Sequence, residues 1–271
     1  MTWPAGKAAA VAFTFDFDAE EVWVAEHPEN ANRPGVLSQG TYGARVAVPE
    51  ILALLERHRL QATFFVPGRV AESHPTRVEA IVAAGHELAL HGYTHRSPAD
   101  MPRAEEESEL VRSIEILSGF GNAPKGYRSP AWEFSPSTVE LLASHGLTYS
   151  SNFMDDIRPY RHQPSGLVEL PVAWLLDDAA HFWFAPDSWT KAIETTAHVE
   201  AIWREELEGL RRMGGASCVF TMHPQVIGRP SRLLMLERLI EHATSLDDVW
   251  VTTCGEIAAA VPAASGAEQL A

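Results

Sequence analysis

The sequence is short of cysteine, of long apolar runs and of positive charge. Its 271 residues include only Cys218 and Cys254, so at most one disulfide can form and a disulfide-stabilised scaffold is excluded. We interpret both as buried thiols in neighbouring strands. No run reaches the roughly 20 apolar residues that cross a bilayer, and residues 1–13 lack the apolar core of a signal peptide. These absences predict a soluble cytoplasmic protein.

The charge balance excludes two further classes of partner. Lysine and arginine number 21 against 36 aspartates and glutamates, which gives a formal net charge of −15. Such an excess of negative charge disfavours binding to nucleic acid or to an anionic membrane surface. The 46% of hydrophobic residues excludes a disordered chain. We therefore expect a globular protein with neither nucleic acid nor a membrane among its partners. A homo-oligomeric state is a separate expectation that does not follow from the composition.

Short β-like runs alternate with helix-like stretches along most of the chain. Several runs are apolar at consecutive positions, as in parallel strands that are covered on both faces. The predicted strands are residues 10–16, 61–67, 86–91, 125–129, 148–153, 167–172, 217–223 and 248–253. Repeated β-then-α units imply parallel strands joined by right-handed crossovers. The predicted fold class is α/β, a distorted (β/α) barrel of seven or eight strands, in one domain of residues 1–271 with its core at 10–256.

Two internal segments depart from this alternation. Residues 19–43 form a long polar insertion after the first strand, and residues 153–166 form a second irregular stretch. Because long loops without secondary structure are often functional lids, we expect the first insertion to cover a site. Tyr42, near its end, is a candidate substrate contact. The Ala-rich tail, residues 258–271, is predicted to be frayed.

Polar side chains gather where the predicted strands end. In a (β/α) barrel these ends lie on one face, which is where active sites are found. The residues are Asp16 and Asp18 after the first strand, His91 and His95 after the third, Arg128 after the fourth, Trp174, Asp177 and Asp178 after the sixth, and His223 after the seventh. Each has a structural explanation by itself, but their shared location predicts a reaction site.

The histidine pair indicates a metal site. His91 and His95 are four residues apart, so one turn can aim both imidazoles at one point. Two histidines with one carboxylate make a frequent metal-binding face that leaves positions open for water and substrate. A lone pair of this spacing is a weak signal, but the aspartates at a neighbouring strand end strengthen it. One aspartate can be a ligand while the other stays free as a base.

The remaining residues match the hydrolysis of an amide. A bound metal lowers the pKa of its water and polarises a carbonyl group. A free carboxylate accepts a proton, and an acid must protonate the departing nitrogen. His223 is the natural acid, and Arg128 can pair with a carboxylate and hold it ionised. These residue types point to acyl transfer at a C–N bond.

Four motifs in this order resemble those of the polysaccharide deacetylase, or NodB-homology, family. They are TFDFD at 14–18, HGYTH at 91–95, RSPAW at 128–132 and TMHP at 221–224. The resemblance covers roughly residues 10–256. It implies a distorted (β/α) barrel of NodB-homology type that works as a metal-dependent amide hydrolase.

The resemblance assigns the base and the metal ligands. By it, Asp16 is the catalytic base and Arg128 tethers that carboxylate. A divalent metal ion, for which we expect zinc, would be held by Asp18, His91 and His95.

The resemblance also assigns the acid and the pocket walls. His223 would be the general acid, and Pro130 and Trp132 would wall the substrate pocket. The family has an aspartate that orients the acid histidine, and here Asp177 and Asp178 are both candidates.

One departure bears on the substrate. Phe17 separates the two aspartates that adjoin each other in many extracellular members, and this spacing resembles an intracellular branch of the family. That branch includes enzymes of cyclic imides and allantoin-like amides as well as a peptidoglycan-deacetylase-like group. The sequence therefore predicts metal-dependent hydrolysis of a non-peptide C–N bond, in an N-acetylated sugar or in a small cyclic imide or ureide. A lid at 19–43 would favour the small molecule.

Two alternatives come from other classes of protein. A non-haem iron oxygenase uses the same face of two histidines and one carboxylate, but it typically has an all-β scaffold, which the β/α alternation contradicts. A non-catalytic metal-binding module would have no reason to keep both Asp16 and His223.

Overall fold

All eight predicted strands are present in a computed structural model that describes residues 3–121, 123–184 and 193–263. They are β1 (Ala9–Asp16), β2 (Thr63–Val66), β3 (Glu87–Leu90), β4 (Gly126–Tyr127), β5 (Tyr149–Ser150), β7 (Val168–Glu169), β8 (Ala216–Met222) and β9 (Val249–Val251). These strands pair in parallel. A short further strand, β6 (Tyr160–Arg161), lies antiparallel to β7 inside the stretch that the sequence leaves irregular.

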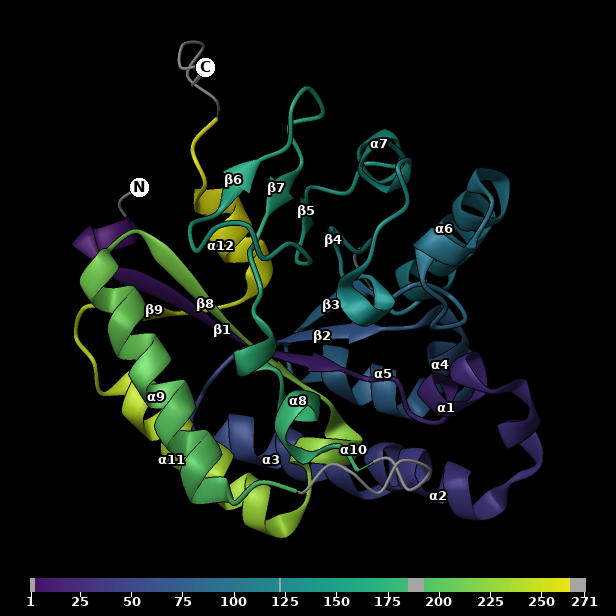
Figure 1. The fold of residues 1–271 in the computed structure, drawn as a ribbon, viewed down its shortest axis with the longest axis horizontal. Coiled ribbons are helices and arrows are strands. Elements are labelled where there is room, and N and C mark those ends of the chain that lie inside the picture. Colours follow the sequence, from purple (N-terminus) through teal and green to yellow (C-terminus); the bar gives the residue numbers. More distant parts are fainter. Residues whose placement is uncertain (1–2, 122, 185–192, 264–271) are drawn as a thin grey trace.

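The sheet curls without closing. Its order is β6-β7-β5-β4-β3-β2-β1-β8, and β9 pairs with β1. Within the described residues, an isolated parallel bridge between Asp177 and Thr221 links the chain after β7 to β8. Figure 1 shows β8 and β9 on one flank of the molecule and β5, β6 and β7 at another. The predicted distorted barrel is confirmed in the form of a curled half-barrel.

Helices cover the outside of the half-barrel. Among those outside the insertion after β1 are α3 (Val48–Arg57), α4 (Gly68–Ser73), α5 (Pro75–Ala83), α6 (Arg103–Ser118), α7 (Thr138–Ser144), α9 (Thr196–Met213), α11 (Pro230–Thr244) and α12 (Cys254–Ala260). Short ones stand at the strand ends, namely α8 (Asp178–Phe182), α10 (Pro224–Ile227), η5 (Pro130–Trp132) and η6 (Trp174–Leu176). Two others are η1 (Pro4–Gly6) and η4 (Pro98–Asp100). Helices α9 and α11 pack against each other and over β8 and β9 (Figure 1).

Strand β1 is the centre of the core. All its residues are buried, because β2 and β8 lie on its two edges and apolar side chains cover both of its faces. The ring centroids of Phe13 and Phe220 lie 5.3 Å apart, and those of Phe15 and Phe64 lie 4.9 Å apart. Within such a strand an unpaired charge would be costly. The carboxylates are therefore confined to the end of β1.

The insertion after β1 is helical, so its prediction as a loop without secondary structure is wrong. It folds into α1 (Glu21–Glu26), η2 (Pro28–Asn32) and α2 (Pro34–Tyr42). A Cβ atom at Gly40 would lie 2.4 Å from the carbonyl oxygen of Ala19. Glycine at this position therefore lets α2 pack directly on the chain that leaves β1.

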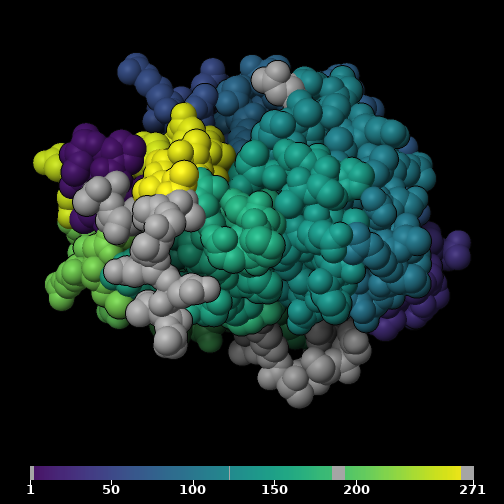
Figure 2. Space-filling view, turned by 90° about the horizontal axis from the view of Figure 1, so that it is seen from above, coloured from purple at the N-terminus to yellow at the C-terminus, as the bar shows by residue number. Residues whose placement is uncertain are grey.

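The C-terminal part also differs from its prediction. Cys218 lies in β8 as expected, but Cys254 begins α12 instead of lying in a strand; both thiols are buried and free. Helix α12 extends to Ala260, so the predicted fraying cannot begin at residue 258, and residues 264–271 lie outside the described part. Residues 3–8 lie beside α12 at one edge of the molecule (Figure 2), where Trp3 and Ile257 share a buried cluster.

The described helices include none with the length and apolar character that a membrane crossing requires.

Candidate active site and metal centre

The end of β1 directs two carboxylates to the same side. Asp16 is the last residue of β1 and Asp18 follows two positions later, with the buried Phe17 between them. The backbone stays extended there, since the amide of Phe17 donates to the carbonyl oxygen of Phe65 at 2.8 Å. Side chains alternate along extended backbone, so Asp16 and Asp18 share a face while Phe17 enters the core. This alternation explains the spacing of the motif.

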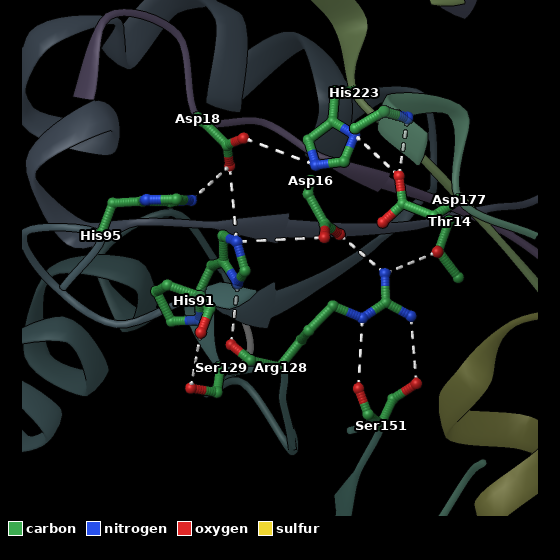
Figure 3. Close-up of polar contacts among 12 residues, drawn as sticks. Thr14, Asp16, Asp18, His91, His95, Arg128, Ser129, Ser151, Asp177 and His223 are labelled. Carbon is green, nitrogen blue, oxygen red and sulfur yellow. Dashed lines mark hydrogen bonds and ion pairs between the residues drawn. The ribbon is translucent and has the colours of Figure 1, made fainter. Parts of the chain in front are cut away.

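The loop after β3 brings two histidines to Asp18. The Oδ1 atom of Asp18 lies 3.5 Å from His91 Nε2 and 3.6 Å from His95 Nε2. Figure 3 draws both contacts as dashed lines. The other nitrogen of His91, Nδ1, lies 2.8 Å from the carbonyl oxygen of Arg128 and donates to it, which leaves the lone pair of Nε2 facing Asp18. Gly92 and His95 both have positive φ values, 71° and 56°, which shape the loop.

This set of donors fits a divalent cation. Within the described part of the chain, Asp18 Oδ1 is buried and has no hydrogen-bond partner, although it faces two imidazole nitrogens. Burial lowers the pKa of His91 to about 4 and that of His95 well below its ordinary value, so both rings are neutral. Burial raises the pKa of Asp18 to about 8, and a cation would reverse this shift because it favours the carboxylate. Asp18, His91 and His95 are therefore a candidate metal site.

A buried arginine holds Asp16. The side chain of Arg128 is 0% exposed, and its Nη1 donates to Asp16 Oδ1 at 2.7 Å and to Thr14 Oγ1 at 2.8 Å. Its Nε and Nη2 donate to Ser151, to the carbonyl oxygen at 3.3 Å and to Oγ at 3.0 Å. The second oxygen of Asp16, Oδ2, lies 3.9 Å from His91 Nε2 (Figure 3). One oxygen of Asp16 is thus fixed and the other faces the candidate metal site.

His223 follows β8 and is held by the chain after β7. Its Nδ1 lies 2.7 Å from Asp178 Oδ1, while its Nε2 lies 3.8 Å from Asp18 Oδ2. Burial lowers the pKa of His223, but the charges of Asp178 and Asp177 outweigh burial and raise that pKa well above its ordinary value. Asp177 lies farther away, 3.8 Å from Nδ1, and its own pKa is raised to about 6 by burial. The acidic side chains around His223 therefore favour the protonated form of its imidazole.

A cavity of about 360 Å³ opens above these groups. Trp132 and Trp174 form one wall with ring centroids 4.5 Å apart, and the side chain of Trp174 is 51% exposed. Trp183 lines the cavity near His223, with ring centroids 6.4 Å apart. The polar and small residues around it are Asp16, Asp18, His91, His95, Ser129, Ala131, Asp177, Ala179, Ala180 and His223.

Helix α1 contributes two lining residues that the sequence analysis missed, Val22 and Glu26. Trp23, on the same helix, stacks on Trp183 with centroids 5.0 Å apart. The insertion after β1 therefore forms a side wall of the cavity instead of a loop over it. The helical spacing of apolar residues in 21–26 is too short a signal to have predicted this role.

Two predicted pocket residues lie elsewhere. The hydroxyl of Tyr42 donates to the carbonyl oxygen of Gly228 at 2.8 Å, and the guanidinium of Arg229 lies 3.9 Å from the centroid of its ring. Tyr42 thus anchors the insertion to the chain after α10. Pro130 is buried behind the cavity wall, near the backbone of Gly92. Of the predicted pocket residues, Trp132 lines the cavity, whereas Tyr42 and Pro130 are not among its lining residues; their contact with a substrate stays a prediction.

Comparison with known proteins agrees with the fold and the motifs. A sequence profile described as polysaccharide deacetylase matches residues 38–150. The peptidoglycan deacetylase of Helicobacter pylori is 33% identical over 93% of this chain and 96% of its own length. A crystal structure from Mycobacterium smegmatis, of a protein described as a polysaccharide deacetylase, covers 100% of this chain and 98% of its own, with 41% identity and a TM-score of 0.92. An allantoinase structure has 25% identity and a TM-score of 0.81, covering 95% of this chain and 91% of its own.

Fold and relatives together define a hydrolase for C–N bonds other than peptide bonds. The chain belongs to the polysaccharide deacetylase family, so the family resemblance is confirmed.

Proposed function

We propose that this protein is a zinc-dependent N-deacetylase of N-acetylated amino sugars in peptidoglycan-like or chitin-like fragments. The observation that carries the proposal is the relation of a base and an acid to one candidate metal site. Asp16 Oδ2 lies 3.9 Å from His91 Nε2, and His223 Nε2 lies 3.8 Å from Asp18 Oδ2. Base and acid therefore each adjoin a ligand of the same site, as hydrolysis of an amide requires.

Asp18, His91 and His95 would hold the metal ion, and two imidazoles with one carboxylate suit zinc. When bound there, a divalent ion supplies a water of lowered pKa and polarisation of the acyl carbonyl. The backbone carbonyl of Arg128 keeps the ring of His91 in the tautomer that such binding needs.

The side chains supply the proton transfers. Asp16 accepts a proton from the attacking water through Oδ2, while Arg128 holds Oδ1 and keeps the carboxylate from turning away. His223 carries a proton at Nε2, because Asp178 accepts from Nδ1 and stabilises the imidazolium. That proton passes to the departing nitrogen, which leaves as an amine.

The aromatic wall favours a sugar ring. Trp132 and the half-exposed Trp174 offer flat apolar faces at the cavity mouth, where a pyranose could pack. The relative from Helicobacter pylori, which matches nearly the full chain, is a peptidoglycan deacetylase. These two observations support an N-acetylated sugar over a small ring.

A second candidate is a hydrolase of a small cyclic imide or ureide. Val22 and Glu26 on α1 narrow one side of the cavity, together with Trp183, and an allantoinase has the same fold at 25% identity. In this reading the same base and acid would open a ring instead of releasing acetate.

One experiment separates the candidates. Zinc-reconstituted protein is incubated with chito-oligomers, peptidoglycan fragments, allantoin, hydantoin and succinimide, and acetate release and ring opening are measured separately. We expect acetate from the glycans, and Asp16→Asn protein loaded with zinc is the control. Ring opening without acetate would favour the second candidate, and no turnover of any substrate would favour a binding module.

A single domain, a cytoplasmic location and a homo-oligomeric state stay predictions, to be checked by limited proteolysis, cell fractionation and light scattering.

A further inference from the structure

Gln225 links the end of β8 to the end of β1. It is the second residue of α10, two positions after His223, and its side chain is 6% exposed. Its Nε2 donates to Asp18 Oδ2 at 3.3 Å. Neither the motifs nor the catalytic chemistry described above gives this glutamine a role.

The orientation of the Gln225 amide follows from the chemistry of its partner. With a cation bound, the Asp18 carboxylate is ionised and can only accept hydrogen bonds, so in that state the amide must present its nitrogen to Asp18. The oxygen, Oε1, is then left buried and, among the residues that the structure describes, without a hydrogen-bond partner. Burying an unsatisfied acceptor is energetically unfavourable. A side chain that bears this cost for one contact to a candidate metal ligand calls for a functional explanation.

The contact determines which oxygen of Asp18 faces the histidines. Both Gln225 Nε2, at 3.3 Å, and His223 Nε2, at 3.8 Å, lie on the side of Oδ2. Oδ1 is left facing the Nε2 atoms of His91 and His95 at 3.5 and 3.6 Å. Rotation of the carboxylate would break the Gln225 contact and move Oδ1 away from both imidazoles.

We propose that Gln225 is a positioning residue that holds the Asp18 carboxylate in the rotamer that binds the cation. The inference rests on the metal site of the proposed function and is independent of the substrate. Hydrogen bonds to a ligating carboxylate fix its direction, and their loss typically lowers metal affinity by about 10–100-fold.

The insertion after β1 supports Gln225 from behind. A Cβ atom at Gly43, where α2 passes into η3 (Gly43–Ala47), would lie 3.1 Å from both Cβ and N of Gln225. The absence of a side chain at Gly43 therefore lets the insertion pack closely on α10. The insertion both lines the cavity through α1 and braces the residue that orients Asp18.

The test measures metal affinity directly. Apo protein is titrated with Zn²⁺ in competition with a chromophoric chelator, and the visible spectrum of the Co²⁺ form reports the geometry of the site. Gln225→Met keeps the length and burial of the side chain but removes its donor, and Gln225→Ala removes both. Gln39→Met is the matched control, because Gln39 lies in α2 and its Nε2 donates to the carbonyl oxygen of Val36.

We expect both Gln225 variants to bind Zn²⁺ about 10–100-fold more weakly than wild type, with a changed Co²⁺ spectrum. The melting temperature of apo Gln225→Met should be no lower than that of the wild-type apo protein. Gly43→Ala keeps Gln225, and we expect it to weaken Zn²⁺ binding and change the Co²⁺ spectrum to a smaller extent. The control should bind like wild type. Equal Zn²⁺ affinity in wild type and Gln225→Met would overturn the positioning role, as would a wild-type protein that binds no Zn²⁺. If the Gln225 variants bind Zn²⁺ more weakly but the wild-type protein deacetylates no substrate, the positioning role is supported and the proposed function is refuted.

Discussion

Asp178 holds His223 at two points with one carboxylate. Its Oδ1 lies 2.7 Å from His223 Nδ1, and its Oδ2 accepts from the backbone amide of the same histidine at 3.0 Å. Asp177 instead accepts from the amide of Ala179 at 2.7 Å and begins α8 as its N-cap. Of the two candidates for orienting the acid, the geometry favours Asp178.

Asp178→Asn should therefore weaken the acid. An asparagine keeps the shape but not the charge that raises the pKa of His223, so that pKa should fall. Because the acid must be protonated, the descending limb of the profile of kcat against pH should move to lower pH. Asp177→Asn is the control, since asparagine also caps helices well and the limb should move less. An equal displacement in both variants would contradict the assignment.

His223→Ala should lower kcat/KM most when the leaving group is poor. Loss of a positioned acid costs about 10²–10⁴-fold for an ordinary amide. The penalty should shrink for anilides with electron-withdrawing groups and for esters, which need less protonation to depart. The measurement is kcat/KM over such a series, with Asp16→Asn as the reference whose penalty stays nearly flat. Equal penalties for poor and good leaving groups would show that His223 does not donate this proton.

Asp18→Ala, His91→Ala and His95→Ala should each lose stoichiometric zinc while the half-barrel stays folded. Removal of one of three protein ligands leaves an incomplete site. Elemental analysis after dialysis gives the zinc content, and circular dichroism confirms folding. His145→Ala is a suitable control, because that histidine lies near Glu107, away from the site. Full zinc content in all three variants would mean that the ligands are other residues.

Asp16→Asn should keep zinc yet lose about 10²–10⁴-fold in turnover, the usual cost of removing a positioned base. Asparagine can still accept a hydrogen bond from Arg128, but the buried guanidinium loses its counter-charge, so circular dichroism must confirm that the variant is folded. Zinc content and single-turnover rates are measured on the same sample. A variant that binds zinc and turns over at the wild-type rate would exclude Asp16 from proton transfer.

Arg128→Met should destabilise the protein by about 3–5 kcal/mol, because it leaves the buried Asp16 carboxylate without its partner. In the Asp16→Asn background, Arg128→Met should lower the free energy of unfolding by a smaller amount, since the Asp16 charge is absent. Urea denaturation of the four proteins gives the coupling free energy. Equal losses in both backgrounds would show that the ion pair does not contribute to stability.

The sequence by itself determined the strands and the face of the site. Apolar runs such as 10–16 mark strands covered on both faces, and parallel strands bring their carboxyl ends to one edge. This rule depends only on local pattern and chain connectivity. It therefore groups four site residues from the sequence: Asp16, Asp18, His91 and His223. The structure shows the contacts between them: His91 Nε2 lies 3.9 Å from Asp16 Oδ2 and 3.5 Å from Asp18 Oδ1, and His223 Nε2 lies 3.8 Å from Asp18 Oδ2.

Other features depended on packing between distant segments. The helices of 19–43 lack a long apolar period, and their position comes from contacts such as that of Gly40 with Ala19 and of Tyr42 with Gly228. Gln225 has no motif, and its link to Asp18 exists because α10 returns to the end of β1.

The sequence also could not decide whether Asp177 or Asp178 orients His223. Adjacent residues point in different directions, and which one faces His223 depends on how the chain after β7 lies against β8. The bridge between Asp177 and Thr221 sets that register across the open side of the half-barrel. Because the two segments are joined there by spatial contact and not by a short connection, only the tertiary structure could decide which carboxylate holds the acid.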